Sequence, residues 1–151
     1  MLSAQTLADA GAYGRVLELL RFRRDVASRL VFEMTEFGVV QDPARSRTFA
    51  AEVRRLGAQF AIDHFGLHRD SLKLLNQLLP HYVKLAPAYT NTLEHNQDSR
   101  FFVSSLIKIA GPLEIGIIAQ AVEAELLLPL LEEMGFAGFQ GYAAGRPEPV
   151  I

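Results

Sequence analysis

The chain has 151 residues, half of them hydrophobic, and a formal net charge of −2, which suits one domain with a substantial core. Acidic and basic residues are interspersed, so there is no electrostatic case for nucleic acid as a partner. The absence of cysteine excludes disulfides and thiolate chemistry. No apolar run reaches the length of a membrane span. We therefore expect a cytoplasmic domain without direct membrane insertion.

Helical and strand-like segments alternate through the first half of the sequence. Hydrophobic spacing predicts, in order, a helix over 13–22, a strand over 30–32, a helix over 43–56, a strand over 59–63 and a helix over 69–78. Ser3 is a candidate N-cap of the first helix. Asp42 and Pro43 have the cap and first-turn chemistry of a helix start, and Gly57 has that of a helix end.

The second half continues the alternation. It predicts a strand over 82–86, a helix over 98–110, a strand over 114–120, a helix over 123–134 and a short strand over 138–142. Asp98 and Gly111 are the expected cap and stop of the first helix of this half, and Pro129 is a candidate kink in the second. The alternation favours a parallel sheet with right-handed crossovers. A doubly wound sheet and a (β/α) barrel both fit this pattern.

Each predicted strand stays apolar until a polar residue appears near its carboxyl end. These residues are Glu33, Asp63, Lys84, Gln120 and Gln140. Parallel strands place all of them at one end of the sheet, which is where barrel enzymes have their active sites. Burying such groups is costly without partners or a ligand. We therefore expect a ligand-binding end, the alternative being that each is an ordinary polar strand terminus.

Short segments in the same order resemble the motifs of the EAL domain. They are LVFEMTE, FAIDHFG, YVKLA, IIAQAVE and GFQGYAAGRPEP, and MLSAQTLAD resembles the segment that precedes them in the family. The resemblance implies an α/β fold of the (β/α) TIM-like barrel type, incomplete, with about five to six β/α units. Residues 1–151 would then form one partial EAL-like domain that lacks the N-terminal strands. The family hydrolyses cyclic di-GMP, a bacterial second messenger, with Mg²⁺ or Mn²⁺.

The resemblance assigns roles to several residues. Glu33 and Asp63 match two metal ligands of the family, and Lys84 matches its active-site lysine. Glu36 matches an acid that holds the loop after the second motif. Each of these positions keeps the residue type that the family's chemistry uses.

Other positions depart from the family pattern. His64 replaces the second aspartate of the DDFG motif, Gln120 replaces a glutamate, and Ala121 and Ala86 replace a glycine and an aspartate. Imidazole is a poor ligand for Mg²⁺, and an amide carries no charge. We therefore expect no catalysis and no bound metal, with the matching carboxylates left as vestigial ligands. A metal role for His64 is the alternative to hydrogen bonding with a ligand or a neighbouring carboxylate.

Loss of catalysis does not remove binding. DHFG variants occur in degenerate EAL domains that act as cyclic di-GMP receptors, notably the LapD-type membrane receptors, so we expect an inactive receptor or signalling domain. The expected ligand-binding residues are Glu33, Asp63, His64, Gly66, Ser71, Lys84, Gln120, Gln140, Gly141, Arg146 and Pro147. Arg146 could instead form a structural salt bridge.

Two other functions fit the same motifs. The first is an interaction scaffold that binds neither nucleotide nor metal, and the second is a residual phosphodiesterase. Open strand edges would call for a protein partner or for the missing N-terminal part of the barrel. The loop at His68 and Arg69 helps form dimers in the family, which makes a homodimer a further option. The chain could also belong to the cytoplasmic part of a membrane-anchored receptor.

Overall fold

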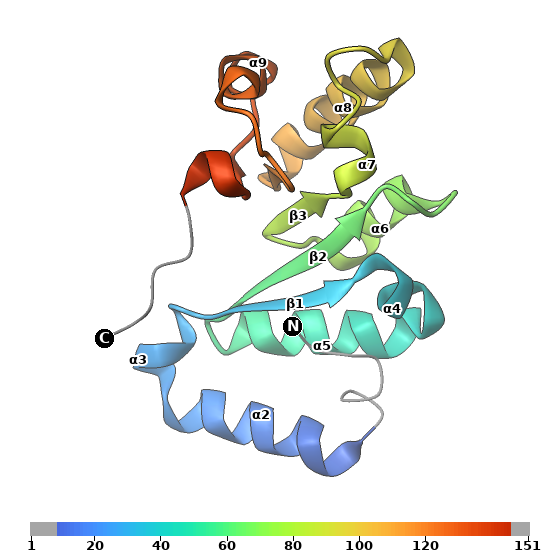
Figure 1. The fold of residues 1–151 in the computed structure, drawn as a ribbon. Coiled ribbons are helices and arrows are strands. Elements are labelled where there is room, and N and C mark those ends of the chain that lie inside the picture. Colours follow the sequence, from blue (N-terminus) through green and yellow to red (C-terminus); the bar gives the residue numbers. More distant parts are fainter. Residues whose placement is uncertain (1–8, 146–151) are drawn as a thin grey trace. The chain divides into compact units, whose positions relative to one another are not determined.

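The structure, a computed structural model, describes residues 9–145 and has a mixed α/β fold (Figure 1). Its five strands follow chain order in the sheet, β1-β2-β3-β4-β5, and both the β1–β2 and β4–β5 pairs are parallel. The predicted α/β alternation is thereby confirmed. The chain divides into two compact units, residues 1–83 and 84–151.

The first unit contains the helices and strands predicted for it, together with two short helices. Its elements are α2 (Ala10–Phe22), α3 (Arg24–Ala27), β1 (Val31–Thr35), α4 (Glu36–Gln41), α5 (Pro43–Arg55), β2 (Gln59–Phe65), α6 (Ser71–Leu78) and the start of β3 (Tyr82–Leu85). The helices α3 and α4 have four and six residues. Such short helices leave too little sequence for a 3.6-residue period to be seen, so they were not predicted.

Capping residues fix the helix ends of this unit. Asp42 accepts a hydrogen bond from the Arg45 amide, and Gly57 adopts a φ of 90° beyond the end of α5, as predicted. The cap of α2 differs from the prediction, because the side chain of Asp9 accepts from the amides of Gly11 and Ala12. The candidate cap Ser3 lies outside the described residues.

Aromatic side chains join α5 to both strands beneath it. The ring of Phe49 meets Phe32 of β1 at a centroid distance of 5.7 Å and Phe60 of β2 at 6.3 Å. Tyr13 of α2 lies 5.8 Å from the same Phe49 ring and donates a hydrogen bond to Glu52. Burial, with a further contribution from that hydrogen bond, raises the pKa of Tyr13 to about 12. The helix α5 therefore covers the groove between β1 and β2, with α2 beside it.

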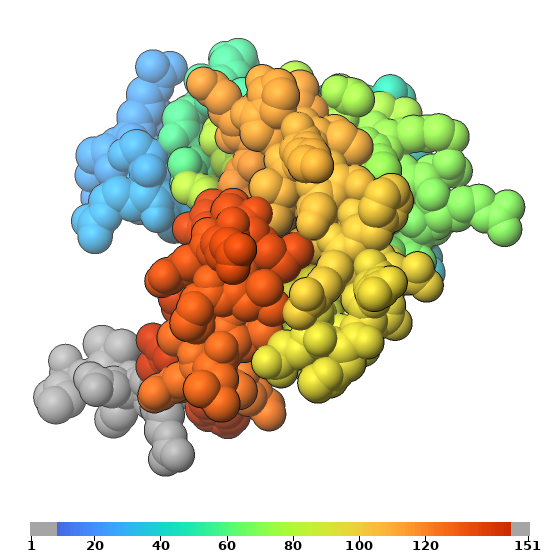
Figure 2. Space-filling model, turned by 90° about the horizontal axis from the view of Figure 1, so that it is seen from above, coloured from blue at the N-terminus to red at the C-terminus, as the bar shows by residue number. Residues whose placement is uncertain are grey.

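The second unit continues the alternation from the end of β3. Its elements are α7 (Pro87–Thr90), α8 (Gln97–Ala110), η1 (Gly111–Leu113), β4 (Gly116–Ala119), η2 (Glu125–Leu127), α9 (Leu128–Met134), β5 (Gly138–Phe139) and η3 (Tyr142–Ala144). Figure 2 shows the outer surfaces of α8, in amber, and α9, in orange. The core includes Leu93, Val103, Leu106 and Leu131, each fully buried.

Three details of this unit correct the prediction. Asn96 rather than Asp98 caps α8, since its side chain accepts from the Ser99 amide at 3.1 Å. Pro129 lies in the first turn of α9 and so does not kink it, because the first turn needs no amide donor from that position. The last strand ends at Phe139, and a 3₁₀ turn over Tyr142–Ala144 follows.

Candidate functional site at the strand ends

Glu33 and Asp63 lie on neighbouring strands of the first unit. In the parallel β1–β2 register Glu33 is opposite Ala61 and Thr35 is opposite Asp63. Because side chains alternate along a strand and partners in register share a face, the two carboxylates are on one face near the carboxyl ends. Asp63 is 5% exposed and Glu33 is half-buried. The structure thus brings these two candidate residues together.

His64 turns back onto the residue before it. Its backbone has a φ of 54°, in the left-handed region that Asn, Asp and His tolerate best among residues with a side chain. Nδ1 of His64 lies 2.9 Å from Oδ2 of Asp63. In this pair Nδ1–H donates to the carboxylate, and the half-exposed ring keeps Nε2 for another partner. The imidazole therefore competes with any cation for that oxygen of Asp63.

The loop after β2 is held by Glu36, as the sequence predicted. This carboxylate is 2% exposed. One of its oxygens accepts from the amide of Gly66 at 3.2 Å, and the other accepts from the amides of Leu67 and His68 at 2.8 and 2.9 Å. Gly66 has a φ of 102°, which favours glycine. Three charge-assisted hydrogen bonds to a buried group fix the path of this loop.

The far end of the loop is also tied to the start of α6. Ser71 is buried, and its hydroxyl donates to the backbone carbonyl of His68. Lys73 forms an ion pair with Asp70 at 2.6 Å, and the hydrogen bond from Lys73 lowers the pKa of Asp70. Both contacts support the loop, so Ser71 has a local structural role whether or not it also meets a ligand.

A pocket of about 430 Å³ opens beside this loop and is lined by Thr35, Glu36, Phe37, His64, Leu67 and His68. Phe37 and Leu67 are 73% and 64% exposed. The sequence analysis missed both residues. The helix that carries Phe37 is too short to show a hydrophobic period. For Leu67 the sequence offered one signal, an apolar residue within a polar loop.

The second unit holds three further candidate residues. Lys84 is 9% exposed within β3, while Gln120 follows β4 and Gln140 follows β5. The strands β4 and β5 pair at Ala119 and Phe139, and the amide of Gln140 donates to the carbonyl of Ala119 at 2.7 Å. The two glutamines therefore follow neighbouring strand ends of this unit.

Gly141 is required by packing. It has a φ of 146°, and a Cβ at this position would fall 2.3 Å from the carbonyl oxygen of Val122. The same Val122 donates its amide to the carbonyl of Gln140 at 2.9 Å, which keeps the two segments close. Ala121 has a φ of 55°, a conformation that favours glycine, the residue of the EAL motif.

Two candidate residues, Arg146 and Pro147, lie outside the described residues. Between residues 9 and 145 there is no group of three or more His, Cys, Asp or Glu that could hold a metal ion. The structure brings together Glu33, Asp63 and His64 in one unit and the two glutamines in the other. That all of them line a common pocket stays a prediction.

The comparisons agree with this fold and this order of motifs. The EAL domain profile matches residues 1–147. The chain is 30% identical over 148 residues to MucR of Pseudomonas aeruginosa, a bifunctional diguanylate cyclase/cyclic di-GMP phosphodiesterase, covering 98% of this chain and 22% of MucR. It is 32% identical over 143 residues to the cyclic di-GMP phosphodiesterase PdeB of Shewanella oneidensis, covering 93% of this chain and 17% of PdeB.

Solved structures give the same result. The MucR phosphodiesterase in complex with cyclic di-GMP superposes with a TM-score of 0.86 at 30% identity, covering 99% of this chain and 60% of that one. LapD of Vibrio cholerae, bound to cyclic di-GMP, superposes with a TM-score of 0.85 at 29% identity, covering 95% of this chain and 35% of that one. The chain belongs to the EAL domain family, and its fold is part of that family's TIM-like barrel. It spans less than a quarter of the length of the two curated relatives.

Proposed function

We propose that this chain is an EAL module that binds cyclic di-GMP without hydrolysing it and acts as a receptor or signalling domain. The observation that carries the proposal is the hydrogen bond between His64 and Asp63 at 2.9 Å. It occupies an oxygen of a carboxylate that matches a metal ligand of the family. The relatives include proteins described as cyclic di-GMP phosphodiesterases and a LapD bound to cyclic di-GMP, so the altered residues decide between the two functions.

The residues present do not fit a pair of divalent cations. Mg²⁺ and Mn²⁺ prefer oxygen ligands, and several carboxylates are needed to balance their charge. His64 supplies nitrogen where the family has a second aspartate, and Gln120 supplies a neutral amide where it has a glutamate. Two negative charges are thereby lost. Without them no metal-bound water is available as a nucleophile, and we assign no hydrolytic step to this chain.

The same substitutions favour binding of an anionic nucleotide. Removing two carboxylates lowers the repulsion that a phosphodiester would meet. Nε2 of His64 is available to a ligand, and Nζ of Lys84 can donate to a phosphate oxygen. The amide of Gln140 can accept from and donate to a guanine edge. Gly66 allows the backbone to approach the ligand closely.

The receptor would work in the cytoplasm, where EAL proteins meet their nucleotide, and it could be attached to a membrane through other segments. No helix within residues 9–145 is long and apolar enough to cross a membrane. The solved LapD chain contains an S helix and a GGDEF segment as well as its EAL domain. That architecture supports a receptor whose occupancy changes a protein contact.

Calorimetric titration with cyclic di-GMP in the presence of EDTA tests the proposal. It should be run on the chain alone and on the chain joined to the upstream strands of an EAL domain. We expect metal-independent binding and no linear dinucleotide after incubation with Mg²⁺ or Mn²⁺. Lys84→Met should weaken binding about tenfold or more. Lys73→Met, which removes an exposed lysine paired with Asp70, is the matched control and should bind normally.

Absence of binding in both forms would contradict the receptor. Turnover to the linear dinucleotide would contradict the loss of catalysis and favour a residual phosphodiesterase. Equal losses of affinity in the Lys84 and Lys73 variants would remove the proposed role of Lys84.

The pocket beside the Glu36-held loop supports a second candidate function, an interaction scaffold that binds neither nucleotide nor metal. Phe37 and Leu67, at 73% and 64% exposure, form an apolar surface of the kind that proteins cover with a partner or a second copy. Light scattering over a range of concentrations tests a homodimer. Phe37→Ser should abolish self-association, whereas Phe101→Ser, on an equally exposed phenylalanine of α8, should not.

A further inference from the structure

Charge is unevenly distributed along the described chain. Residues 10–30 contain five arginines against two acids, whereas residues 31–145 contain nine basic and thirteen acidic residues. One of the two acids, Asp25, accepts hydrogen bonds from Arg23 at 3.0 and 3.1 Å. The segment that forms α2 and α3 is therefore a positive region of an otherwise acidic chain, and such a region attracts anionic partners.

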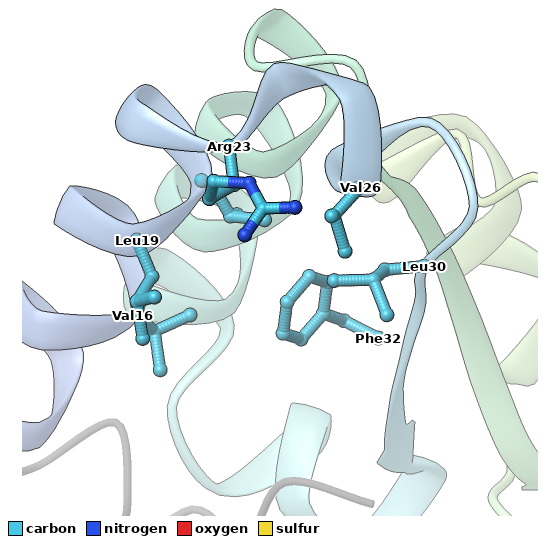
Figure 3. Close-up of a pocket in the computed structure, with 7 residues that line it drawn as sticks. Val16, Leu19, Arg23, Val26, Leu30 and Phe32 are labelled. Atoms are coloured by element: carbon cyan, nitrogen blue, oxygen red, sulfur yellow. The ribbon is translucent and has the colours of Figure 1, made fainter.

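One side of α2 lines an apolar pocket of about 290 Å³ (Figure 3). Figure 3 shows Val16 and Leu19 of α2 across the pocket from Leu30 and Phe32, with Arg23 beside it. This side lies at the edge of β1, where we already expect the missing part of the barrel. That part of the barrel is the expected occupant of the pocket.

A different side of α2 faces outward. Phe22 follows Tyr13 by nine residues, which is about two and a half turns of an α-helix, so the two side chains leave the helix on opposite sides. Tyr13 packs on Phe49 of α5, and Phe22 is 81% exposed. The ring of Phe22 therefore lies on the outer surface of the helical layer.

Arginines surround Phe22 on this side. Arg15 precedes Phe22 by seven residues and so shares its face of the helix. Arg21 is the residue before Phe22, and Arg24 begins α3 two residues after it. All three arginines are exposed, and the acid Glu18 on the same face offsets one of their charges. We call this surface the outer face of α2, and its members are Arg15, Arg21, Phe22 and Arg24.

We propose that the outer face of α2 docks this protein on the surface of an anionic lipid membrane. The guanidinium groups of Arg21 and Arg24 donate to lipid phosphates, which they can meet with paired hydrogen bonds. Arg15 adds to the attraction toward the negative surface. The ring of Phe22 enters the boundary between the headgroups and the acyl chains, where the apolar side chains of interfacial helices lie.

The shape of the surface favours a bilayer over a protein partner. A bound peptide or helix is held in a groove that has pockets for its anchoring side chains, and the pocket beside α2 lies on its other side, at β1. The outer face is the convex side of one helix with a protruding ring, to which a fluid bilayer can adapt. A second copy would bring like charges together at this face, which is unfavourable.

Vesicle sedimentation with the whole 151-residue chain tests the proposal. Vesicles made of equal amounts of phosphatidylglycerol and phosphatidylcholine should bind the protein. Vesicles of phosphatidylcholine alone should bind it at least about tenfold more weakly, because they carry no net charge. Raising the salt concentration to about 0.5 M should weaken binding to the anionic vesicles, since salt screens exposed charges.

Arg21→Gln combined with Arg24→Gln should lower the partition coefficient on anionic vesicles at least about tenfold, because two charges near the lipid surface are lost. The matched control combines Arg69→Gln with Lys108→Gln, which removes two exposed cations outside α2 and α3. It changes the net charge equally and should lower the partition coefficient less than about twofold, because charges beyond a Debye length are screened.

Phe22→Ser tests the aromatic part of the contact. It should lower the partition coefficient at least about threefold, through the loss of buried apolar area. Phe101→Ser, at 77% exposure on α8, is the matched control and should bind like the original protein. All of these side chains are exposed, so thermal unfolding of the variants should match that of the original protein.

Equal binding of the original protein and the Arg21/Arg24 variant would overturn the proposal, as would equal binding to neutral vesicles. Unchanged binding of the Phe22 variant would also overturn it, since the contact would then be electrostatic alone. Binding of an oligoglutamate peptide without binding of anionic vesicles would assign the face to an acidic protein segment instead. All measurements are made without nucleotide, so their outcome is independent of the proposed receptor function.

Discussion

The end of β2 and the loop that follows it differ in what they retain of the EAL motif. The loop from Gly66 to His68 keeps the arrangement that the EAL motif implies, with three amides donating to the buried carboxylate of Glu36. Asp63 and His64, which precede that loop in β2, have an imidazole where the EAL motif has a second carboxylate, and this imidazole is hydrogen-bonded to Asp63. Within a few residues, therefore, the contacts that hold the loop are retained while the charge at position 64 is changed.

The physical reason lies in what each residue supports. Removing Glu36 would leave the buried amide of Gly66 and the part-buried amides of Leu67 and His68 without this acceptor, which costs folding free energy. Exchanging the aspartate at position 64 for histidine costs little in folding, because histidine also tolerates positive φ. Only the negative charge is lost, and that matters to a cation and not to the fold.

The largest expected effect is on stability and concerns the loop that Glu36 holds. Glu36→Gln should destabilise the protein by about 3 kcal/mol. The amide nitrogen that replaces one carboxylate oxygen cannot accept, so at least one loop amide loses its acceptor, and the others lose a charged one. Urea denaturation measures the loss. Glu133→Gln, at an exposed position of α9, is the control and should stay within about 0.5 kcal/mol of the original protein. Similar stabilities of the two variants would show that the Glu36 contacts contribute little.

The second prediction concerns the substituted motif positions, where carboxylates can be restored. His64→Asp combined with Gln120→Glu should raise the affinity for Mn²⁺ about tenfold or more, through two added carboxylates. Titration calorimetry with MnCl₂ measures the change. The control combines His64→Asn with Gln120→Glu. Asparagine tolerates the same positive φ at position 64 but adds no charge there, so this variant should gain less affinity for Mn²⁺. Tight Mn²⁺ binding by the unaltered protein would contradict the expected absence of a metal.

Ala121 is a second kind of altered motif position. Here alanine replaces the glycine of the EAL motif, and we expect the replacement to reduce stability. An alanine at a φ of 55° is strained, so Ala121→Gly should stabilise the protein by about 1 kcal/mol. Ala124→Gly, at a φ of −102°, relieves no strain and should destabilise it by about 0.5 kcal/mol. Thermal or urea unfolding distinguishes the two. A loss of stability in both variants would rule out strain at position 121.

The smallest expected effect concerns His81, which follows α6 and precedes β3. Its Nδ1 accepts from the amide of Phe60 at 3.1 Å. Burial, and then the charge of Arg54, lower the pKa of His81 below its ordinary value of 6.5. The folded protein therefore binds fewer protons than the unfolded chain, and stability falls as the pH drops below 6.5.

Urea midpoints at several pH values from neutral to mildly acidic measure this dependence. His81→Asn retains an acceptor without a titrating ring, so its acid-side loss of stability should be smaller. His95→Asn, at an exposed position, should keep the original dependence. An unchanged pH profile in the His81 variant would exclude this histidine as the cause.

Much of the fold was predictable because local chemistry and tertiary structure agree. Asp42, Pro43 and Gly57 bound α5 as their capping preferences require. The expected polar residues lie within the last residues of β1, β2 and β3, or directly after β4 and β5. The prediction failed where an element is too short to show a period, or where tertiary structure selects one of two possible capping residues. Six residues of α4 carry no period, and Asn96 caps α8 although an aspartate stands two residues later.

The candidate site was predictable in identity and less so in geometry. The motif order indicated Glu33, Asp63 and Glu36. The β1–β2 register puts Glu33 and Asp63 on one face of the sheet, and Glu36 accepts hydrogen bonds from the loop after β2. Hydrogen bonding of His64 to a ligand or to a neighbouring carboxylate was expected from the sequence, and the structure has the second of these, with Asp63 as the partner. That contact depends on a single positive φ, which a residue type permits but does not require.

The close approach of Gly141 to the main chain of Val122 bears on how family members with altered motifs should be classified. A side chain at position 141 would collide with the neighbouring main chain, so selection for folding alone would preserve this glycine in lineages that had abandoned every nucleotide. Its presence in a sequence is therefore uninformative about signalling. A diagnostic for surviving receptors should weigh the charged and amide positions and disregard the glycine.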